Sequence, residues 1–379
     1  MLKKLSLALV MMATCASAGF AQDFVRLHKP TLTPQNSGTT QLLIAVSPVN
    51  SRVVWASGQG GTFVVTTDGG DTWRSGTVPD AAAAGEEFRD VQGVSDKIAY
   101  LMSIGNNAND FKIYKTIDGG DNWTLEFTNQ LANAFYDCMA FWTPRRGLAH
   151  SDSVNGVFPE LRTVDGRHWE SISANMPPAL PGEASFSSSG TCITTEGERN
   201  AWITTGGSAI SRVIATRDGG NTWNAYDTPL PSSPSAGGLS IAFRDPFNGI
   251  VGGGDLSNDA ATIAAVSHDG GRNWHVTNKP PTPGAIFCLA YASGMRLNDF
   301  EELDFLREIL EFASGFDRLV VITTETLPDF AAGDAAWSPD EGNTWYEMPS
   351  VSGYWGLAFA NPHAGWFVGN NGQILKISF

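Results

Sequence analysis

A short pattern, Ser/Thr-x-Asp-x-Gly-x-x-Trp, occurs six times in this chain of 379 residues and limits the folds that it can adopt. Four copies have glycine at both the fourth and the fifth position, and they span 66–73, 116–123, 216–223 and 267–274. A fifth copy, 338–345, carries Glu341 in place of the first of its two glycines, and the copy at 163–169 is one residue shorter. Chance does not produce six such copies, so the chain is built from repeated units.

The distance between the copies predicts a β-propeller. Successive aspartates of the pattern are 47 to 53 residues apart, with one longer step of 71 residues. Repeats of about 40–50 residues built from short strands are typical of propeller blades. A further unit at 357–377 follows the last copy, which makes seven blades in one all-β domain. We expect a strand near Asp23–Leu27 to complete the seventh blade, because a closed ring leaves no exposed edge.

The repeated pattern has the chemistry of a tight hairpin turn. Its aspartate can accept hydrogen bonds from the backbone of its own turn, and its glycines allow a positive φ. Its tryptophan is expected to pack between neighbouring sheets, with the indole N–H near a polar turn. Calcium binding is the less favoured alternative, because the turn lacks the carboxylates that about six to eight oxygen ligands require. The structural pairs are Asp68 and Trp73, Asp118 and Trp123, Asp165 and Trp169, Asp218 and Trp223, Asp269 and Trp274, and Asp340 and Trp345.

Residues 1–21 have the features of a secretory signal peptide. Two lysines precede an apolar run, and small residues allow cleavage after Ala18 or after Ala21. The apolar run is too short to span a membrane, and no later stretch reaches the required length. We therefore expect residues 22–379 to form one periplasmic or extracellular propeller domain.

Charge and motif content exclude several classes of function. The formal net charge is −15 at pH 7, and a surface this acidic repels phosphate groups. Binding to nucleic acid or to anionic lipid is therefore not expected. The sequence also has no Gly-x-Gly-x-x-Gly that opens a helix, no Cys-x-x-Cys and no haem or copper ligand set, so no cofactor is predicted.

Three cysteines follow the predicted leader. Cys138 and Cys288 occupy matching positions on the first strands of the third and sixth blades, which lie across the ring from each other. Cys192 can pair with Cys138 from the adjoining blade, but we favour buried free thiols that pack as small apolar side chains.

The step of 71 residues contains an insertion at 295–318, with a predicted helix at 298–313. Asn298 and Glu301 fit a capping box, and Gly315 offers a stop. Two interpretations stay open. The helix either decorates the sixth blade or acts as a lid or docking element over the mouth of the channel.

Candidate binding residues come from the first strands, because propellers place their sites where these strands and their loops converge on the axis. One arginine, two carboxylates and three aromatic rings can bind a polar ligand or a partner. In the alternative interpretation, Arg89 forms an ion pair with Asp90 or Asp137, and these charged side chains simply line a water-filled channel. The carboxylates of Asp90 and Asp137 can also lie at the separation that a glycosidase needs. The candidates are Arg89, Asp90, Tyr136, Asp137, Phe287 and Trp355.

The six copies resemble the Asp-box, or bacterial neuraminidase repeat, which is specific for propellers but not for a function. The pairing of this pattern with Ala-Phe-x-Asn/Asp-Pro-x-x-Gly, at 242–249 and 358–365, is similar to propellers of the photosystem II stability and assembly factor type. This resemblance implies a non-catalytic ring that binds a protein partner during assembly of a membrane complex. In the photosynthetic members a basic patch contributes to binding, whereas this chain is strongly acidic.

Glycosidases provide the alternative interpretation, because sialidases and xyloglucanase-like enzymes also contain Asp boxes. The Arg-Ile-Pro signature of sialidases is missing, and the length suffices for one ring rather than for the two that clamp xyloglucan. We therefore predict a secreted scaffold for a protein partner, without catalytic, cofactor-binding or metal-binding residues. A carbohydrate-active hydrolase with a site at the channel mouth is the second hypothesis, and carbohydrate is then the ligand.

Overall fold

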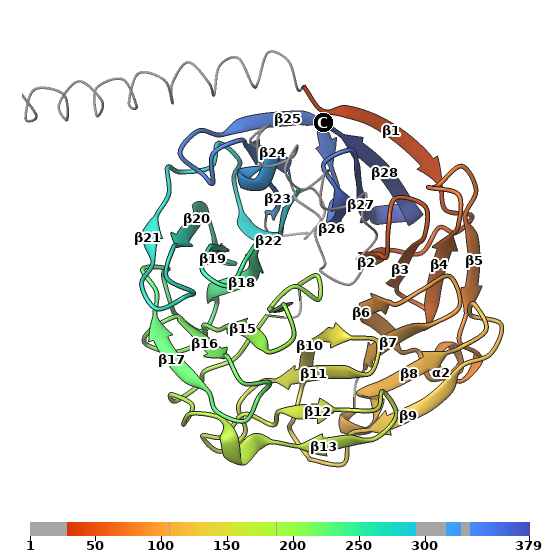
Figure 1. Ribbon diagram of the computed structural model, residues 1–379, viewed down its shortest axis with the longest axis horizontal. Coiled ribbons are helices and arrows are strands. Elements are labelled where there is room, and N and C mark those ends of the chain that lie inside the picture. The colour runs from red at the N-terminus through yellow and green to blue at the C-terminus, as the bar shows by residue number, and fades with distance from the viewer. Residues whose placement is uncertain (1–28, 106, 187, 293–315, 327–333) are drawn as a thin grey trace, which may run out of the picture.

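The computed structural model describes residues 29–105, 107–186, 188–292, 316–326 and 334–379. Its strands form seven sheets of four strands each, arranged as blades around a central axis (Figure 1). In each of blades 1 to 6, the strands follow chain order from the axis outward. The prediction of a seven-bladed all-β propeller is confirmed.

The first four blades are regular antiparallel sheets. Blade 1 contains β2 (Leu43–Pro48), β3 (Val54–Gly58), β4 (Thr62–Thr66) and β5 (Arg74–Thr77). Blade 2 contains β6 (Glu87–Gly93), β7 (Ala99–Ile104), β8 (Lys112–Thr116) and β9 (Thr124–Thr128). Blade 3 contains β10 (Tyr136–Thr143), β11 (Arg146–Ser151), β12 (Leu161–Thr163) and β13 (Trp169–Ser171). Blade 4 contains β14 (Ile193–Glu196), β15 (Asn200–Thr204), β16 (Arg212–Thr216) and β17 (Asn224–Asp227).

The remaining blades complete the ring. Blade 5 contains β18 (Ala236–Phe243), β19 (Gly249–Asp255), β20 (Asn258–Ser267) and β21 (His275–Val276). Blade 6 contains β22 (Ala285–Tyr291), β23 (Val320–Glu325), β24 (Asp334–Ser338) and β25 (Tyr346–Ser352). Blade 7 contains β26 (Tyr354–Asn361), β27 (Ala364–Gly369), β28 (Gln373–Ser378) and β1 (Thr31–Asn36). Short helical segments are α2 (Pro79–Ala84), η1 (Ala108–Asp110), η2 (Ser173–Asn175), η3 (Phe316–Arg318) and η4 (Asn370–Gly372).

Strand β1 closes the ring by pairing with β28, so it is the outermost strand of blade 7. The side chain of Gln35 supports this closure. Its Oε1 accepts hydrogen bonds from Trp366 Nε1 of blade 7 at 3.2 Å and from Trp73 Nε1 of blade 1 at 3.1 Å. Closure by an N-terminal strand is thus confirmed, but that strand is β1, and Asp23–Leu27 lies outside the described residues.

The apolar core lies between the blades, and the second strands supply its largest side chains. Trp55 of β3, Tyr100 of β7 and Trp202 of β15 are fully buried. Each ring also bonds to the next blade: Trp55 Nε1 donates to Ser95 O at 2.8 Å, and the Tyr100 hydroxyl donates to Pro144 O at 2.9 Å. Truncating one such ring to alanine typically costs about 3–5 kcal/mol, so these residues hold neighbouring blades together.

The Asp boxes form the hairpins between the third and fourth strands of blades 1 to 6. Asp68 Oδ1 accepts a hydrogen bond from Thr72 N at 2.9 Å and another from Thr66 Oγ1 at 2.7 Å. Hydrogen bonds led by the Thr72 hydroxyl hold the pKa of Asp68 well below its usual range. The side-chain amide of Asn122 leads the same effect in the second box and lowers the pKa of Asp118 to about 2.

The boxes also join neighbouring blades, through the residue that follows the box aspartate. In five boxes this residue is glycine, and its carbonyl accepts a hydrogen bond from a basic side chain of the preceding blade. The pairs are Lys376 and Gly69, Arg74 and Gly119, Lys115 and Gly166, Arg162 and Gly219, and Arg217 and Gly270. In blade 6 the residue is Glu341, at φ 56°, and its buried carboxylate binds Arg244 at 2.7 Å and Arg318 at 3.1 Å.

A disulfide joins Cys138 of β10 to Cys192, directly before β14, and so links blades 3 and 4. The expectation of free thiols is therefore wrong for these two residues, and it holds for Cys288, which is free and buried. The inner strands of adjoining blades bring the two Cα atoms to 6.0 Å, a separation that a disulfide spans. The sequence did not show where β14 begins, so the facing positions could not be recognised.

Two predicted segments fall outside the described residues. The leader at 1–21 is one, and the helix at 298–313 within the insertion 295–318 is the other. Of that insertion, the structure describes η3. In the described part of the chain, no helix is long and apolar enough to cross a membrane.

Candidate functional site

The six predicted site residues lie near the beginnings of inner strands, at one end of the ring that we call the axial mouth. The structure divides them into two groups rather than one site. Arg89, Phe287 and Trp355 form an aromatic group that spans blades 2, 6 and 7. Asp90, Tyr136 and Asp137 form a buried group between blades 2 and 3.

The aromatic group joins three blades through ring contacts. The Arg89 guanidinium lies 5.8 Å from the centroid of the Trp355 ring, a cation–π arrangement, and Arg89 Nε donates to Glu87 Oε1 at 2.6 Å. Trp355 meets Phe287 edge to face, with ring centroids 5.6 Å apart. Phe287 belongs to a small apolar cluster with Leu239, onto which Trp355 packs. These contacts fix the arginine in place.

The carboxylates of the second group are buried inside the fold. Asp90 accepts hydrogen bonds from Val91 N and Met139 N, both at 2.7 Å. Asp137 is 1 % exposed, and its buried Oδ2 has no hydrogen-bond partner among the described residues. Burial, followed by the charge of Asp152, raises the pKa of Asp137 well above its usual range.

Two further residues near the mouth are also buried. Tyr136 packs edge to face on Phe127, with ring centroids 5.8 Å apart. Glu325, at the end of β23, is buried with neither carboxyl oxygen bonded within the described part of the chain, and burial raises its pKa to about 8. The sequence did not single out Glu325, because a lone glutamate near a strand end carries no pattern.

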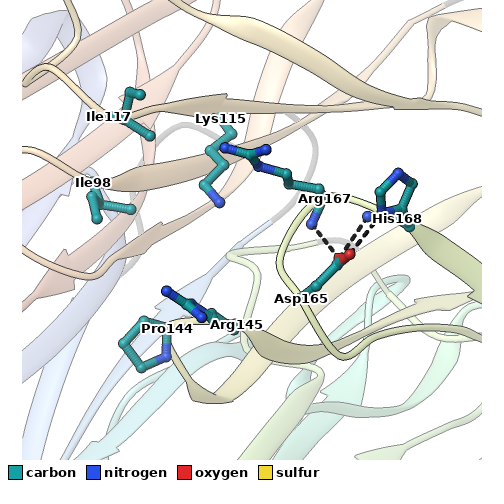
Figure 2. Close-up of a pocket in the computed structure, with 8 residues that line it drawn as sticks. All are labelled: Ile98, Lys115, Ile117, Pro144, Arg145, Asp165, Arg167 and His168. Atoms are coloured by element: carbon teal, nitrogen blue, oxygen red, sulfur yellow. Dashed lines mark hydrogen bonds and ion pairs between the residues drawn. The ribbon is translucent and has the colours of Figure 1, made fainter.

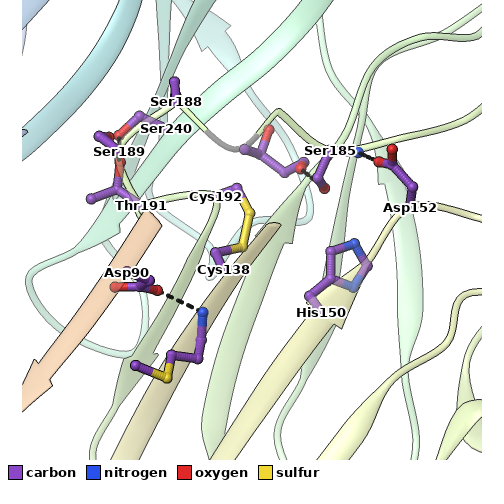
Figure 3. The surroundings of a disulfide bond; sticks show 12 residues. Asp90, Cys138, His150, Asp152, Ser185, Ser188, Ser189, Thr191, Cys192 and Ser240 are labelled. Carbon is purple, nitrogen blue, oxygen red and sulfur yellow. Dashed lines mark hydrogen bonds between the residues drawn. A yellow bond between two sulfur atoms is a disulfide. The ribbon is translucent and has the colours of Figure 1, made fainter. Parts of the chain in front are cut away.

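A segment of blade 4 crosses the axial channel, and nothing in our sequence analysis anticipated it. The hydroxyls of Ser188 and Ser189 donate to Phe287 O of blade 6 at 2.9 and 2.8 Å. Gly190, at φ 74°, lies so close to Asp90 of blade 2 that a Cβ would be 2.6 Å from its Cγ. In Figure 1 this is the yellow-green loop at the centre of the ring, and Figure 3 shows its side chains.

The crossing segment, which we define as residues 185–186 and 188–192, also contacts blade 5. Thr191 Oγ1 lies 2.7 Å from Ser240 Oγ of β18. The crossing segment explains why β14 is shorter than the other inner strands. Strand β14 has four residues, whereas β10 has eight. The serine run before Cys192 was the available sequence signal, since it interrupts the apolar alternation of an inner strand.

A groove opens between blades 2 and 3 at the opposite end of the ring, where the Asp boxes lie; we call this end the box face. Its volume is about 450 Å³ (Figure 2). The β10–β11 turn forms one side, the third Asp box another and the end of β8 a third. The lining residues are Ile98, Lys115, Ile117, Pro144, Arg145, Asp165, Arg167 and His168.

The groove combines basic and apolar side chains. Lys115 Nζ donates to Gly166 O at 2.9 Å, and burial lowers its pKa. Arg145 and Arg167 are exposed, and neither guanidinium has an ion pair within the described residues. Ile117, 64 % exposed, is among the most exposed large apolar side chains described. Such a site can hold carboxylates beside an aliphatic side chain.

The sequence missed this groove because its residues come from four separate turns and strand ends. Arg145 and Arg167, taken alone, are ordinary exposed residues of turns, and Lys115 is a half-buried residue near the end of β8. The sequence feature that could have indicated the groove is Ile117, an apolar residue at the second position of a box, where the hairpin is exposed. No group of three or more histidine, cysteine, aspartate or glutamate side chains that could hold a metal ion occurs among the described residues.

Comparison with solved structures identifies the fold. YCF48 bound to a D1 peptide superposes with a TM-score of 0.56 and 17 % identity, over 92 % of this chain and 97 % of that one. YCF48 from Cyanidioschyzon merolae gives a TM-score of 0.61 and 16 % identity, over 92 % and 98 % of the two chains. The fold is that of YCF48. The predicted similarity to propellers of the photosystem II assembly factor type is thus confirmed at the level of fold.

A glycosidase shares the same architecture. The GH74 xyloglucanase from Xanthomonas campestris gives a TM-score of 0.63 and 12 % identity, over 91 % of this chain but 53 % of the enzyme. The chain therefore spans about half the length of that enzyme. No protein-family model matches the sequence, and no curated protein matches it.

Proposed function

We propose that this chain is a non-catalytic scaffold that binds an extended segment of a protein partner in the groove between blades 2 and 3. One observation carries the proposal: Arg145 and Arg167 present exposed guanidinium groups beside the exposed side chain of Ile117. On a molecule with a net charge of −15, such a basic site attracts carboxylates against the overall field. An acidic segment with an aliphatic residue fits it in charge and polarity.

The structural neighbours support a peptide-like ligand. YCF48 has this fold and has been solved with a D1 peptide bound. Fold similarity at 17 % identity does not transfer a partner, so the partner of this chain is argued from its own groove. The proposal differs from our first expectation, which put the partner at the axial mouth, where Tyr136 and Asp137 are buried.

We place this scaffold in the periplasm or outside the cell, in the assembly of an envelope or membrane complex. The sequence of residues 1–21 supports export. The disulfide between Cys138 and Cys192 supports an oxidising compartment, because disulfides persist there and are rare in the cytosol.

A carbohydrate-active hydrolase is less well supported. The carboxylates considered for it, Asp90 and Asp137, are 6 % and 1 % exposed, and that of Asp90 accepts hydrogen bonds from Val91 N and Met139 N. The crossing segment lies over Asp90 as well. Fold similarity to a xyloglucanase favours the alternative, and a glycan-hydrolysis screen of the purified chain tests it. Turnover that disappears in Asp137→Asn would replace the scaffold proposal.

Selection from a displayed library of random peptides tests the groove. We expect the full chain to select acidic peptides that contain an aliphatic residue. The double variant Arg145→Ser, Arg167→Ser should weaken their binding by about tenfold or more, as expected for the loss of two charge-assisted contacts. Fluorescence anisotropy with the selected peptides measures the change in Kd.

The control variant removes two arginines at equivalent positions of other blades. Arg199 lies in the turn after the inner strand of blade 4, as Arg145 does in blade 3, and Arg272 lies in the box of blade 5. Arg199→Ser with Arg272→Ser changes the net charge equally and should leave Kd within about twofold. An equal loss in both double variants would show attraction by net charge alone and would contradict a groove site.

A further inference from the structure

His168 lies at the basic end of the groove between blades 2 and 3. It belongs to the Asp box of blade 3, as Arg167 does, and its side chain is 89 % exposed. The apolar lining residues gather at the other end of the groove, and they are Ile98, Ile117 and Pro144 (Figure 2). Histidine, unlike arginine, changes its charge between about pH 5 and pH 8. The basic end therefore contains one group whose charge depends on pH in the physiological range.

The Asp box determines which ring nitrogen of His168 carries the first proton. His168 Nδ1 lies 2.6 Å from Asp165 Oδ2. This hydrogen bond is the largest of the contacts that hold the pKa of Asp165 well below its usual range, so the carboxylate is ionised at neutral pH. An ionised carboxylate only accepts hydrogen bonds, so Nδ1 carries a proton and donates it to Asp165. Nε2 is therefore the nitrogen that gains or loses a proton as pH changes.

Protonation reverses what Nε2 offers to a ligand. In the neutral ring Nε2 is a hydrogen-bond acceptor, and its lone pair opposes a carboxylate. In the charged ring Nε2 carries an N–H group, which donates to a carboxylate and attracts it by charge. Within the described residues, the hydrogen bonds of the imidazole involve Nδ1 alone. Nε2 is therefore the atom of His168 that another molecule can use.

Charged groups from three other elements surround the basic end. Lys115 of β8 and Arg145 of the β10–β11 turn add positive charge. Glu126 of β9 is the opposing carboxylate, and burial raises its pKa against the charges of Lys115, Arg167 and His168. Protonation of Glu126 and protonation of His168 both make the groove more positive. The two groups therefore act in the same direction as pH falls, and an experiment must separate them.

We propose that His168 is a pH-dependent contact for an acidic partner segment, whose carboxylate it binds through Nε2–H when the imidazole is protonated. The contact is lost when the ring becomes neutral, so the partner is held more tightly in acid and released as pH rises. This regulation rests on the proposed binding of an acidic segment in the groove. Arg145 and Arg167 keep their charge throughout this pH range and supply the part of the binding that does not depend on pH.

The sign and the size of the effect follow from linkage. A ligand that prefers the protonated ring raises the affinity of the ring for its proton by the same factor. Affinity for the ligand therefore increases as pH falls, by at most about tenfold per pH unit for one proton. Because an exposed ion pair contributes modestly, we expect Kd to be about three- to fivefold lower at about pH 5.5 than at about pH 8. Glutamates of the ligand stay mainly ionised over this range.

Fluorescence anisotropy on the full chain tests the contact, with a labelled peptide of alternating glutamate and leucine as the probe. His168→Gln should reduce the pH effect to less than about 1.5-fold and leave Kd at about pH 8 within about twofold of the wild type. The box should keep its shape in this variant, because the backbone N–H groups of Arg167 and of residue 168 both donate to Asp165 Oδ1 at 2.8 Å.

A second exposed histidine provides the matched control. His268 lies in the box of blade 5, outside the groove, and its Nδ1 is 2.8 Å from Asn248 Oδ1. His268→Gln should keep the full pH dependence, and Glu126→Gln should keep most of it. A pH dependence that survives in His168→Gln but disappears in Glu126→Gln would overturn the assignment to His168.

NMR of the full chain with isotope-labelled histidine tests the reciprocal effect. The peptide should raise the pH at which Nε2 of His168 titrates by about 0.5–0.7 pH units, which corresponds to a three- to fivefold change in Kd. The signal is assigned by its absence in His168→Gln. An unchanged titration with peptide bound would overturn the proposal.

The two proposals for the groove fail in different ways. Peptide binding that depends on Arg145 and Arg167 but not on pH would overturn the role of His168 and leave the groove as the binding site. Absence of binding at every pH, with this probe and with peptides from the displayed library, would overturn both proposals.

Discussion

The axial mouth and the box-face groove use charged side chains in opposite ways. At the mouth, Glu183 is fully buried and bonded to Arg212, and the carboxylate of Asp90 accepts hydrogen bonds from Val91 N and Met139 N. In the groove, Arg145 and Arg167 are exposed and have no ion pair within the described residues. Buried, mutually bonded charges stabilise the fold, whereas exposed, unpaired charges are available to another molecule. Convergence on the axis alone therefore does not identify a binding site.

The largest expected effect comes from replacing one arginine at the axial mouth and one in the groove and comparing the two losses of stability. Arg212→Ala leaves the Glu183 carboxylate buried without its cation and should reduce the free energy of unfolding by about 3–5 kcal/mol. Arg145→Ala should change it by less than about 0.5 kcal/mol. Urea denaturation of both variants measures the difference. Equal effects would contradict the division between a structural and a binding end.

Removal of the disulfide should cause the next largest loss of stability. Replacing both Cys138 and Cys192 by alanine should cost about 2–4 kcal/mol of unfolding free energy, mainly because the unfolded chain loses a cross-link. Hydrogen exchange of the crossing segment should increase at the same time, since its covalent attachment to blade 3 is lost. The control, Cys288→Ala, removes a buried thiol without a cross-link and should leave exchange of the crossing segment as in the wild type.

Salt should separate groove binding from fold stability. Exposed ion pairs are screened at high ionic strength, so peptide affinity in the groove should fall several-fold between about 0.05 and 0.5 M NaCl. The melting temperature should change little over the same range, because the charges of the mouth are buried. Peptide binding that is insensitive to salt would point to an apolar site elsewhere on the ring.

The smallest effect is expected at the exposed Asp boxes. The pKa of Asp118 is lowered to about 2, so its contribution to stability is present above its unfolded value of about 4 and is lost as pH falls through about 2. The melting temperatures of wild type and Asp118→Ala should therefore differ near neutral pH and converge in acid. Asp71→Ala, at an exposed position of the first box, provides the control.

The sequence predicted the ring because the pattern that defines it is local. Each Asp box contains its own turn chemistry, and the spacing of six copies gives the number of blades. The position of β1 was not predicted, because Thr31–Asn36 contains Pro34 and four polar residues and so lacks the apolar pattern of a strand.

The groove and the crossing segment were not predictable, because both depend on contacts between distant parts of the chain. Arg145 and Arg167 become neighbours through the pairing of blade 3, and the role of Ser188 depends on Phe287, a residue of blade 6. The predicted set at the mouth was placed correctly at the ends of inner strands. The sequence did not reveal that the side chains of Asp90, Asp137 and Tyr136 are buried.

The closure of the ring has a consequence for the order of events during biosynthesis. Gln35 is translated early, but its partner Trp366 follows 331 positions later. Blade 7 therefore cannot form until almost the whole polypeptide has left the ribosome, and until then the ring has two open edges. A chain exported in an unfolded form would keep this final step for its destination, where the first strand meets the last and the circle is completed.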